Sequence, residues 1–268
     1  MDHQGTSDKV KDIFYSNSCK QDWLRAINFT SLQKTTIALE SYFIKCNVKS
    51  MEQIFIADKI SFLEFAGFKN TCYIGAAQLL MSFPEFVVLP HDVKLYLYTC
   101  FLPNFLTISS IVLSKNIFKK HGRGSKYLLI IGEKTAFNLE SHILSNKRLS
   151  LDQNGNLTQE SDNPVFKYLI TNIYKPIYEM DLDLTELAYI SLKLLWSTDN
   201  EPILSEQLKS MMQKTFTLAN SEMHDYYVKV KGISDYQWRL NKMEQLIECA
   251  REYDFLKIEA LESGLVAF

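Results

Sequence analysis

Cysteine is the residue type in this chain with the widest range of chemistry, because thiolates bind zinc, form disulfides and act as nucleophiles. The 268-residue chain has five cysteines, and no two of them form a C-x-x-C pair. Five cysteines without paired spacing do not make a zinc finger or a disulfide framework. We therefore expect reduced, mostly buried thiols that pack like small apolar side chains; they are Cys19, Cys46, Cys72, Cys100 and Cys249.

The other candidates for catalysis or metal binding are weaker. Gly122-Arg123-Gly124 lacks the further glycine or lysine of a phosphate-binding loop and follows no strand pattern, so we interpret it as a turn. Asp181 and Asp183 precede a helical pattern, where capping explains them. Neither G-x-S-x-G nor H-E-x-x-H occurs. We expect no enzyme and no metal site, since the histidines also lack ligand spacing: His3, His91, His121, His142 and His224.

The charge of the chain argues against two classes of partner. Its 29 basic and 31 acidic residues give a net charge of −2, which is no electrostatic footprint for DNA or an anionic membrane. The polar residues 1–14 contain no apolar run, so we expect no secretory signal. Residues 95–114 are uncharged and long enough to span a bilayer, but Pro103-Asn104 and several hydroxyl side chains interrupt them. A helix buried on all sides explains this segment better.

Hydrophobic periodicity predicts a helical domain over residues 21–268, after a flexible leader over 1–20. The small number of glycines (9) and prolines (6) also favours helices over a loop-rich sandwich. Asp183 with Glu186, and Ser234 with Gln237, form capping-box patterns that predict two helix starts. We expect nine to eleven helices, including segments over 23–44, within 51–83, from 90 to 114, from 163, from 183, over 204–231 and over 234–262.

Two segments depart from the helical pattern. Residues 126–139 contain two short apolar runs around Gly132-Glu133, which predicts a β-hairpin. Residues 146–162 are polar and include the turn signal Asn154-Gly155, which predicts a surface loop. The predicted fold class is therefore all-α with one small hairpin.

Three motifs occur in the order and spacing of a known family. Leu184-Thr-Glu-Leu-Ala188 is one, and Arg239-Leu240 followed by Lys242 and Leu246 is another. The third lies in residues 81–106 and consists of Pro84, Phe86, Leu89, Asp92, Leu95 and Leu97. Together they resemble the ligand-binding domain of nuclear receptors, most closely the divergent nematode nuclear hormone receptors. The resemblance covers residues 20–264.

The resemblance implies a three-layer helical sandwich with a lipid-binding pocket, in which a fatty acid or another lipid is the expected ligand and no other cofactor is expected. An alternative is that the positions facing the pocket simply fill the core. These positions are Phe68, Cys72, Leu102, Leu106, Ser110, Leu129 and Ile131.

The chain departs from the family where co-activators bind. The two basic groove residues of the family are replaced here by Met81 and Thr99, or by Tyr98 with a one-residue shift. Neither position can donate a charge-assisted hydrogen bond to the end of a partner helix. Residues 256–261 come near the pattern of the final activation helix, but we interpret them as the end of the preceding helix. Co-regulators would then bind by a non-standard mode.

The resemblance also implies two structural contacts. Glu186 and Arg239 occupy the positions of an ion pair between two helices of the family. The final helix, 234–262, is expected to mediate homo- or heterodimerisation through Trp238, Met243, Leu246 and Ile247, whose spread around the helix exceeds one core-facing stripe.

Three functional hypotheses remain open from sequence. The first is a regulatory domain that binds a small lipophilic ligand and regulates transcription through protein partners. The second is a ligand-independent dimerising adaptor with a filled pocket, and the third is a helical enzyme or lipid carrier. The chain cannot supply the eight zinc-binding cysteines of the family's DNA-binding module. We therefore expect no direct DNA binding and no membrane association, and a location in the nucleus, or in the cytoplasm if the protein naturally lacks that module.

Overall fold

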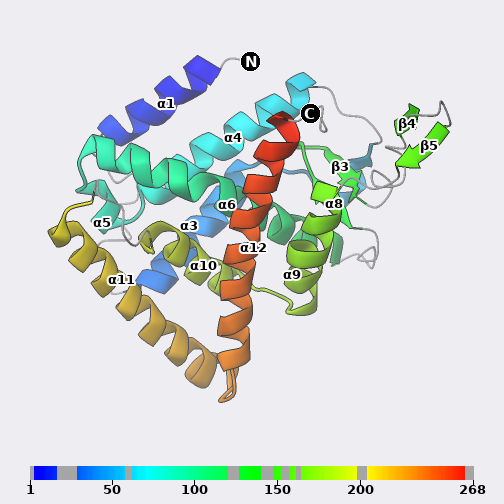
Figure 1. The fold of residues 1–268 in the computed structure, drawn as a ribbon. Helices are drawn as coiled ribbons and strands as arrows, with labels where there is room; N and C mark the ends of the chain where they lie inside the picture. Colours follow the sequence, from blue (N-terminus) through cyan, green and yellow to red (C-terminus); the bar gives the residue numbers. More distant parts are fainter. Residues whose placement is uncertain are drawn as a thin grey trace.

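The computed structural model describes residues 3–16, 29–57, 62–119, 127–139, 148–151, 157–160, 164–197 and 204–262. Most of these residues are helical and enclose one large apolar core (Figure 1). The α-helices are α1 (His3–Tyr15), α3 (Ser31–Lys45), α4 (Phe62–Leu80), α5 (Pro84–Val87), α6 (His91–Phe118), α8 (Pro164–Leu169), α9 (Lys175–Glu179), α10 (Leu184–Trp196), α11 (Glu206–Asp225) and α12 (Gln237–Glu262). Shorter helical segments are the 3-10 turn Met51–Gln53 and the π-helical segments Ile170–Tyr174 and Tyr226–Lys231.

The helices form three layers around α6 and α10. α3 and α4 pack against one side of this central pair, and α12 packs against the other. α8 also packs against α12, and α11 lies against α3 and α10. Figure 1 shows α12 in front of the central layer with α3 behind it. The predicted three-layer, all-α sandwich is confirmed.

α6 contains the long uncharged segment and lies inside the fold. In the described part of the chain it is the one helix long and apolar enough to cross a membrane. Its residues are buried on several sides, among them Phe101, Phe105, Ile108 and Ile111. The helix continues through Pro103 and ends at Phe118. This burial is what the sequence predicts for a core helix.

Capping boxes begin two of the helices. Asp183 caps α10 by accepting a hydrogen bond from the backbone of Glu186, whose side chain bonds back to the Asp183 backbone. Thr30 and Gln33 cap α3 in the same way. The predicted box at Ser234 is wrong, because α12 begins three residues later, at Gln237.

Five short strands form two separate sheets. The predicted hairpin is confirmed as β2 (Leu128–Ile130) paired antiparallel with β3 (Thr135–Asn138). β1 (Phe55–Ile56) adds a third, parallel strand beside β3. The prediction of a loop over 146–162 is wrong, since β4 (Arg148–Leu151) and β5 (Leu157–Glu160) form a second antiparallel hairpin. Local polarity does not exclude strands there, because pairing satisfies the backbone groups of both.

The predicted flexible leader over residues 1–20 is also wrong in its described part. Residues 3–15 form α1, which packs against α4 and α6. Val10 and Phe14 are buried, so this helix is fixed by tertiary contacts that a local pattern of polar residues does not reveal.

Candidate functional site

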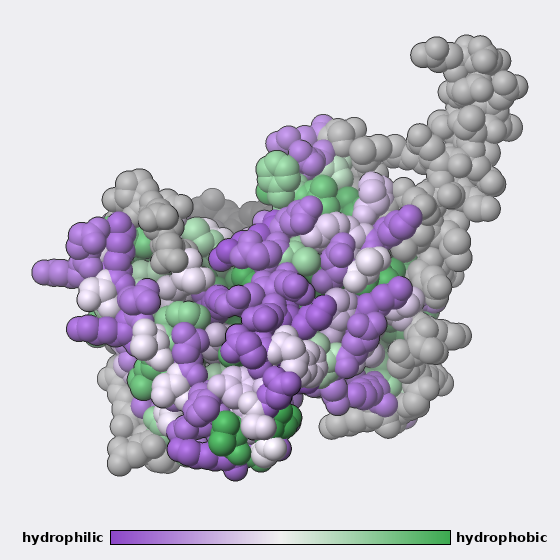
Figure 2. All heavy atoms as spheres, turned by 60° about the horizontal axis from the view of Figure 1, so that its bottom comes forward, coloured by the Kyte–Doolittle hydropathy of each residue, from purple (hydrophilic) through white to green (hydrophobic). Residues whose placement is uncertain are grey.

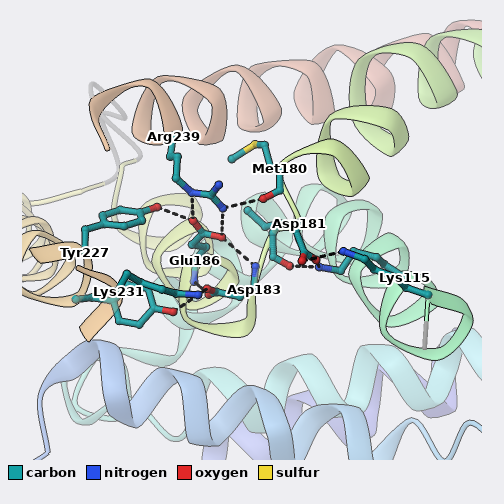
Figure 3. Close-up of polar contacts among 11 residues, drawn as sticks. Lys115, Met180, Asp181, Asp183, Glu186, Tyr227, Lys231 and Arg239 are labelled. Carbon is teal, nitrogen blue, oxygen red and sulfur yellow. Dashed lines mark hydrogen bonds and ion pairs between the residues drawn. The ribbon is translucent and has the colours of Figure 1, made fainter. Parts of the chain in front are cut away.

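Glu186 of α10 and Arg239 of α12 form a buried ion pair (Figure 3). The guanidinium donates from Nε to Oε1 at 2.6 Å and from Nη2 to Oε2 at 2.9 Å. Nη2 also donates to the carbonyl oxygen of Met180 at 2.9 Å. The Glu186 side chain is 1% exposed and that of Arg239 is 15% exposed. The expected contact between the two helices is therefore present, with bidentate geometry that favours arginine over lysine.

Further donors complete the shell of Glu186. The hydroxyl of Tyr227 donates to Oε1 at 2.6 Å, and the backbone N–H of Asp183 donates to Oε2 at 2.9 Å. The hydrogen bond with Glu186 raises the pKa of Arg239 above its ordinary value. Burial, and then the same carboxylate, raise the pKa of Tyr227. The buried charge of Glu186 is thus compensated by four donors, as a stable buried carboxylate requires.

A second charge cluster joins the same helix start to the segment after α11. Asp183 accepts a hydrogen bond from Tyr226 at 2.7 Å and forms an ion pair with Lys231 at 2.9 Å. Burial alone would raise the pKa of Asp183, but the contacts with Lys231 and Tyr226 lower it overall. Asp183 therefore acts as a helix cap and as an anchor for Lys231.

Asp181 is not the helix cap that its position suggests. Its carboxylate pairs with Lys115 of α6 and with Lys119 just after that helix, both at 2.8 Å. Hydrogen bonds from Lys115 and then Lys119 lower its pKa to about 2. Lys115 is buried and also donates to the carbonyl oxygen of Leu182. Asp181 adopts the left-handed region at φ 51°, which turns the backbone before α10. Sequence reasoning missed this contact, since its partners are 66 and 62 residues away.

The seven residues expected to face a ligand are distributed over α4, α6 and the β2–β3 hairpin. Phe68, Cys72, Leu106 and Ile131 are buried with 7–8% exposure. Leu102, Ser110 and Leu129 are half-buried. Their neighbours on the same helices, such as Ala76 and Phe105, are fully buried at 0% exposure. Phe68, Cys72 and Leu106 therefore belong to the apolar core, and Leu102, Ser110 and Leu129 keep partial exposure.

One of the seven, Cys72, lies against a second thiol. The sulfur atoms of Cys46 and Cys72 are 3.9 Å apart, so α3 and α4 meet there. The hydrogen bond with Cys72, and then burial, raise the pKa of Cys46. Both thiols are free and buried, as the sequence predicts. The raised pKa disfavours the thiolate of Cys46, whereas the hydrogen bond with Cys46 lowers the pKa of Cys72.

The positions of the missing groove charges do not form a binding pair. Met81 is buried, and the exposed Thr99 donates to the carbonyl oxygen of Tyr96 in its own helix. Tyr98 is buried and donates to the carbonyl oxygen of Tyr73 at 3.0 Å, which ties α6 to α4. Phe14 of α1 packs over Tyr98. The surface formed here by α4, α5 and α6 is thus covered by α1.

The prediction that four residues of α12 form a dimer surface is wrong for three of them. Met243, Leu246 and Ile247 are buried in the core at 0–1% exposure, because they face α6 and α10. Trp238 is 48% exposed, with the Arg239 guanidinium 5.1 Å from its ring centroid. Phe255 and Ile258 are also exposed among the residues of α12 whose burial the structure describes. Figure 2, in which the lower side of Figure 1 comes forward, shows a mostly hydrophilic face with scattered apolar residues.

Comparison with known proteins supports the fold on which these residues lie. A solved structure with a similar fold is the Ultraspiracle ligand-binding domain from Drosophila melanogaster, at 12% sequence identity and a TM-score of 0.56. The match covers 88% of this chain and 89% of that one. A search of curated proteins gives no significant match. Residues 56–263 match the family model described as the ligand-binding domain of nuclear hormone receptor. The chain therefore belongs to the nuclear hormone receptor ligand-binding domain family.

Proposed function

We propose that this chain binds one small lipophilic ligand and, through protein partners, regulates transcription in the nucleus. Membership in the family supports a ligand-regulated, transcription-factor-type domain without enzymatic activity. The observation that carries the ligand proposal is the residual exposure of Leu102, Leu106 and Ser110, which lie along one stripe of the central helix α6. Residues one turn apart share a helix face, so these three side chains lie on the same face of α6.

The chemistry of the seven residues favours an apolar ligand. Five are aliphatic or aromatic, and none carries a charge; only Cys72 and Ser110 are polar. The Ser110 hydroxyl already donates to the carbonyl oxygen of Thr107 at 3.0 Å. Affinity would therefore come from burial of hydrocarbon surface, at about 25 cal/mol per Å². A fatty acid or a similar lipid fits this lining.

A dansyl-labelled fatty acid tests the proposal in solution. We expect saturable binding with one site per chain. Ser110→Phe would fill the space beside α6 and weaken binding tenfold or more, which corresponds to about 1.4 kcal/mol. Thr36→Phe is the matched control, because Thr36 is also half-buried on a helix and donates to its own helix at Leu32. Equal binding by both variants would place the lipid elsewhere.

The second candidate is a ligand-independent dimerising adaptor with a filled pocket. It is favoured by the contact between Cys72 and Cys46, because one of the seven candidate ligand residues packs there against the chain itself. In that case the labelled fatty acid would not bind. Ser110→Phe would then destabilise the fold by about 1–3 kcal/mol, since an overpacked core has no room for the ring.

We further propose that α12 contributes a dimer contact, now through its exposed residues. Trp238, Phe255 and Ile258 are the apolar residues of this helix that can reach a partner. With few exposed apolar residues, such an interface would be mostly polar.

A further inference from the structure

We infer that α1 is an internal occupant of a docking surface for an amphipathic partner helix, formed by α4, α5 and α6. α1 covers this surface in the structure, and the helix of a partner protein would have to replace it there. The inference extends the proposed regulation through protein partners, but it does not depend on a bound ligand. Residues 3–15 also precede the part of the chain, 56–263, that matches the family model.

The spacing of the α1 side chains fits helix-in-groove binding. Val10, Ile13 and Phe14 lie at positions i, i+3 and i+4, which form one face of a helix. Val10 is 5% exposed and Phe14 is 1% exposed, and Ile13 packs against the core with partial burial. Asp8, Lys9 and Asp12 are exposed on the other side. α1 therefore uses a narrow apolar stripe and otherwise faces solvent.

Aromatic side chains of the docking surface contact this apolar stripe. The ring of Phe14 meets the ring of Phe86 in α5 at 5.6 Å and the ring of Tyr98 in α6 at 5.4 Å, both edge to face. Tyr15 stacks on His91 at the start of α6 with a centroid distance of 3.7 Å. α4 also packs against α1, and Figure 1 shows the two helices side by side. Three elements of the domain thus converge on one short helix.

A buried lysine contacts the C-terminal end of α1. Lys94 of α6 is 1% exposed, and its ammonium donates to the carbonyl oxygen of Phe14 at 3.3 Å. The last carbonyl groups of a helix lack intrahelical donors and carry partial negative charge, so a cation there is stabilising. Lys94 would therefore donate to the C-terminal carbonyl groups of any helix that lies on this surface. Neither Met81 nor Thr99 can provide this contact.

These contacts define the partner by its chemistry. It should be an amphipathic helix with apolar residues at i, i+3 and i+4, whose free C-terminal carbonyl groups follow the last apolar residue. Because α1 belongs to the same chain as the surface it covers, a partner helix has to compete with it intramolecularly. The apparent affinity of the partner is then reduced by the fraction of molecules in which the surface is free.

The α1 peptide itself is a suitable probe. A fluorescein-labelled peptide of residues 1–16 is titrated with the full chain and with Phe14→Ala, and its anisotropy is measured. Phe14→Ala weakens the internal occupant, so we expect this variant to bind the peptide at least tenfold more tightly than the unchanged chain does. A peptide that carries the same Phe14→Ala change should not bind. Asp12→Ala is the matched control on the exposed side of α1 and should behave like the unchanged chain.

Three outcomes would overturn the inference. One is equal affinity of the peptide for the unchanged chain and for Phe14→Ala. Another is the absence of binding to both. The third is loss of the folded circular dichroism spectrum in Phe14→Ala, because exchange at this surface requires a domain that folds without α1 in place. The titration uses no lipid, so its failure leaves the ligand proposal untouched.

Discussion

Arg239 at the start of α12 holds the buried carboxylate of Glu186 in α10 with two parallel hydrogen bonds of 2.6 and 2.9 Å. The same guanidinium also binds the carbonyl oxygen of Met180, which lies before α10. One side chain therefore joins the outer helix to the central layer and to the turn that precedes it.

Removing one partner of this pair should be costly. We expect Arg239→Met to lower the free energy of unfolding by about 3–5 kcal/mol, because Glu186 would remain buried without its cation. Arg251→Met is the matched control within α12. Arg251 pairs with Glu248 at the surface, and its loss should cost about 0–1 kcal/mol. Urea unfolding measures both, and a loss below about 1 kcal/mol for Arg239→Met would contradict the structural role.

Asp181 should make stability depend on pH. Its pKa of about 2 in the fold lies below the ordinary value of 3.8, so its pairs with Lys115 and Lys119 contribute fully above that ordinary value. The contribution is lost as the pH falls toward about 2, when the folded carboxylate takes up its proton. Asp181→Asn tolerates the left-handed backbone but removes the charge. The stability difference between the chain and this variant should therefore shrink between about pH 5 and pH 2 in urea unfolding. A difference that stays constant with pH would contradict the pairing.

The exposed residues of α12 should control self-association. Single-molecule mass measurement at micromolar concentration should show particles of about twice the 31.1 kDa chain mass. Phe255→Glu should shift them to the monomer without unfolding, because Phe255 is exposed. Met243→Glu should instead unfold the domain, since it would bury an unpaired charge. Particles of monomer mass in the unchanged chain would rule out the dimer.

The chain alone should not bind duplex DNA with appreciable affinity. Its net charge of −2 offers no basic surface for counterion release. Electrophoretic mobility shifts at low and moderate salt provide the measurement. A complex whose affinity falls steeply with salt concentration would show that the chain has a phosphate-binding surface after all.

Motifs with fixed spacing predicted the most about this protein. The hairpin over 126–139, the burial of α6 and the capping box at Asp183 all follow from local patterns that few structures satisfy. Glu186 and Arg239 could be paired only through the order of the family motifs, since 53 residues separate them. The bidentate match between guanidinium and carboxylate then explains the geometry of the contact.

Long-range packing accounts for what the sequence did not predict. α1 has a short apolar stripe among polar residues, and its contacts with α4, α5 and α6 distinguish it from a flexible leader. Met243, Leu246 and Ile247 have the same residue types as an interface, and their burial depends on where α12 crosses the central layer. The candidate ligand residues share this property. Their residual exposure depends on three elements that are distant in sequence.

Native mass spectrometry of the purified chain tests the central claim most directly. The claim is that the domain holds one lipophilic ligand beside α6. The folded protein should be heavier than the denatured chain by the mass of one lipid, and Ser110→Phe should lack this excess while remaining folded. A folded chain with only its polypeptide mass, which also gains no mass when a fatty acid is added, would contradict the claim.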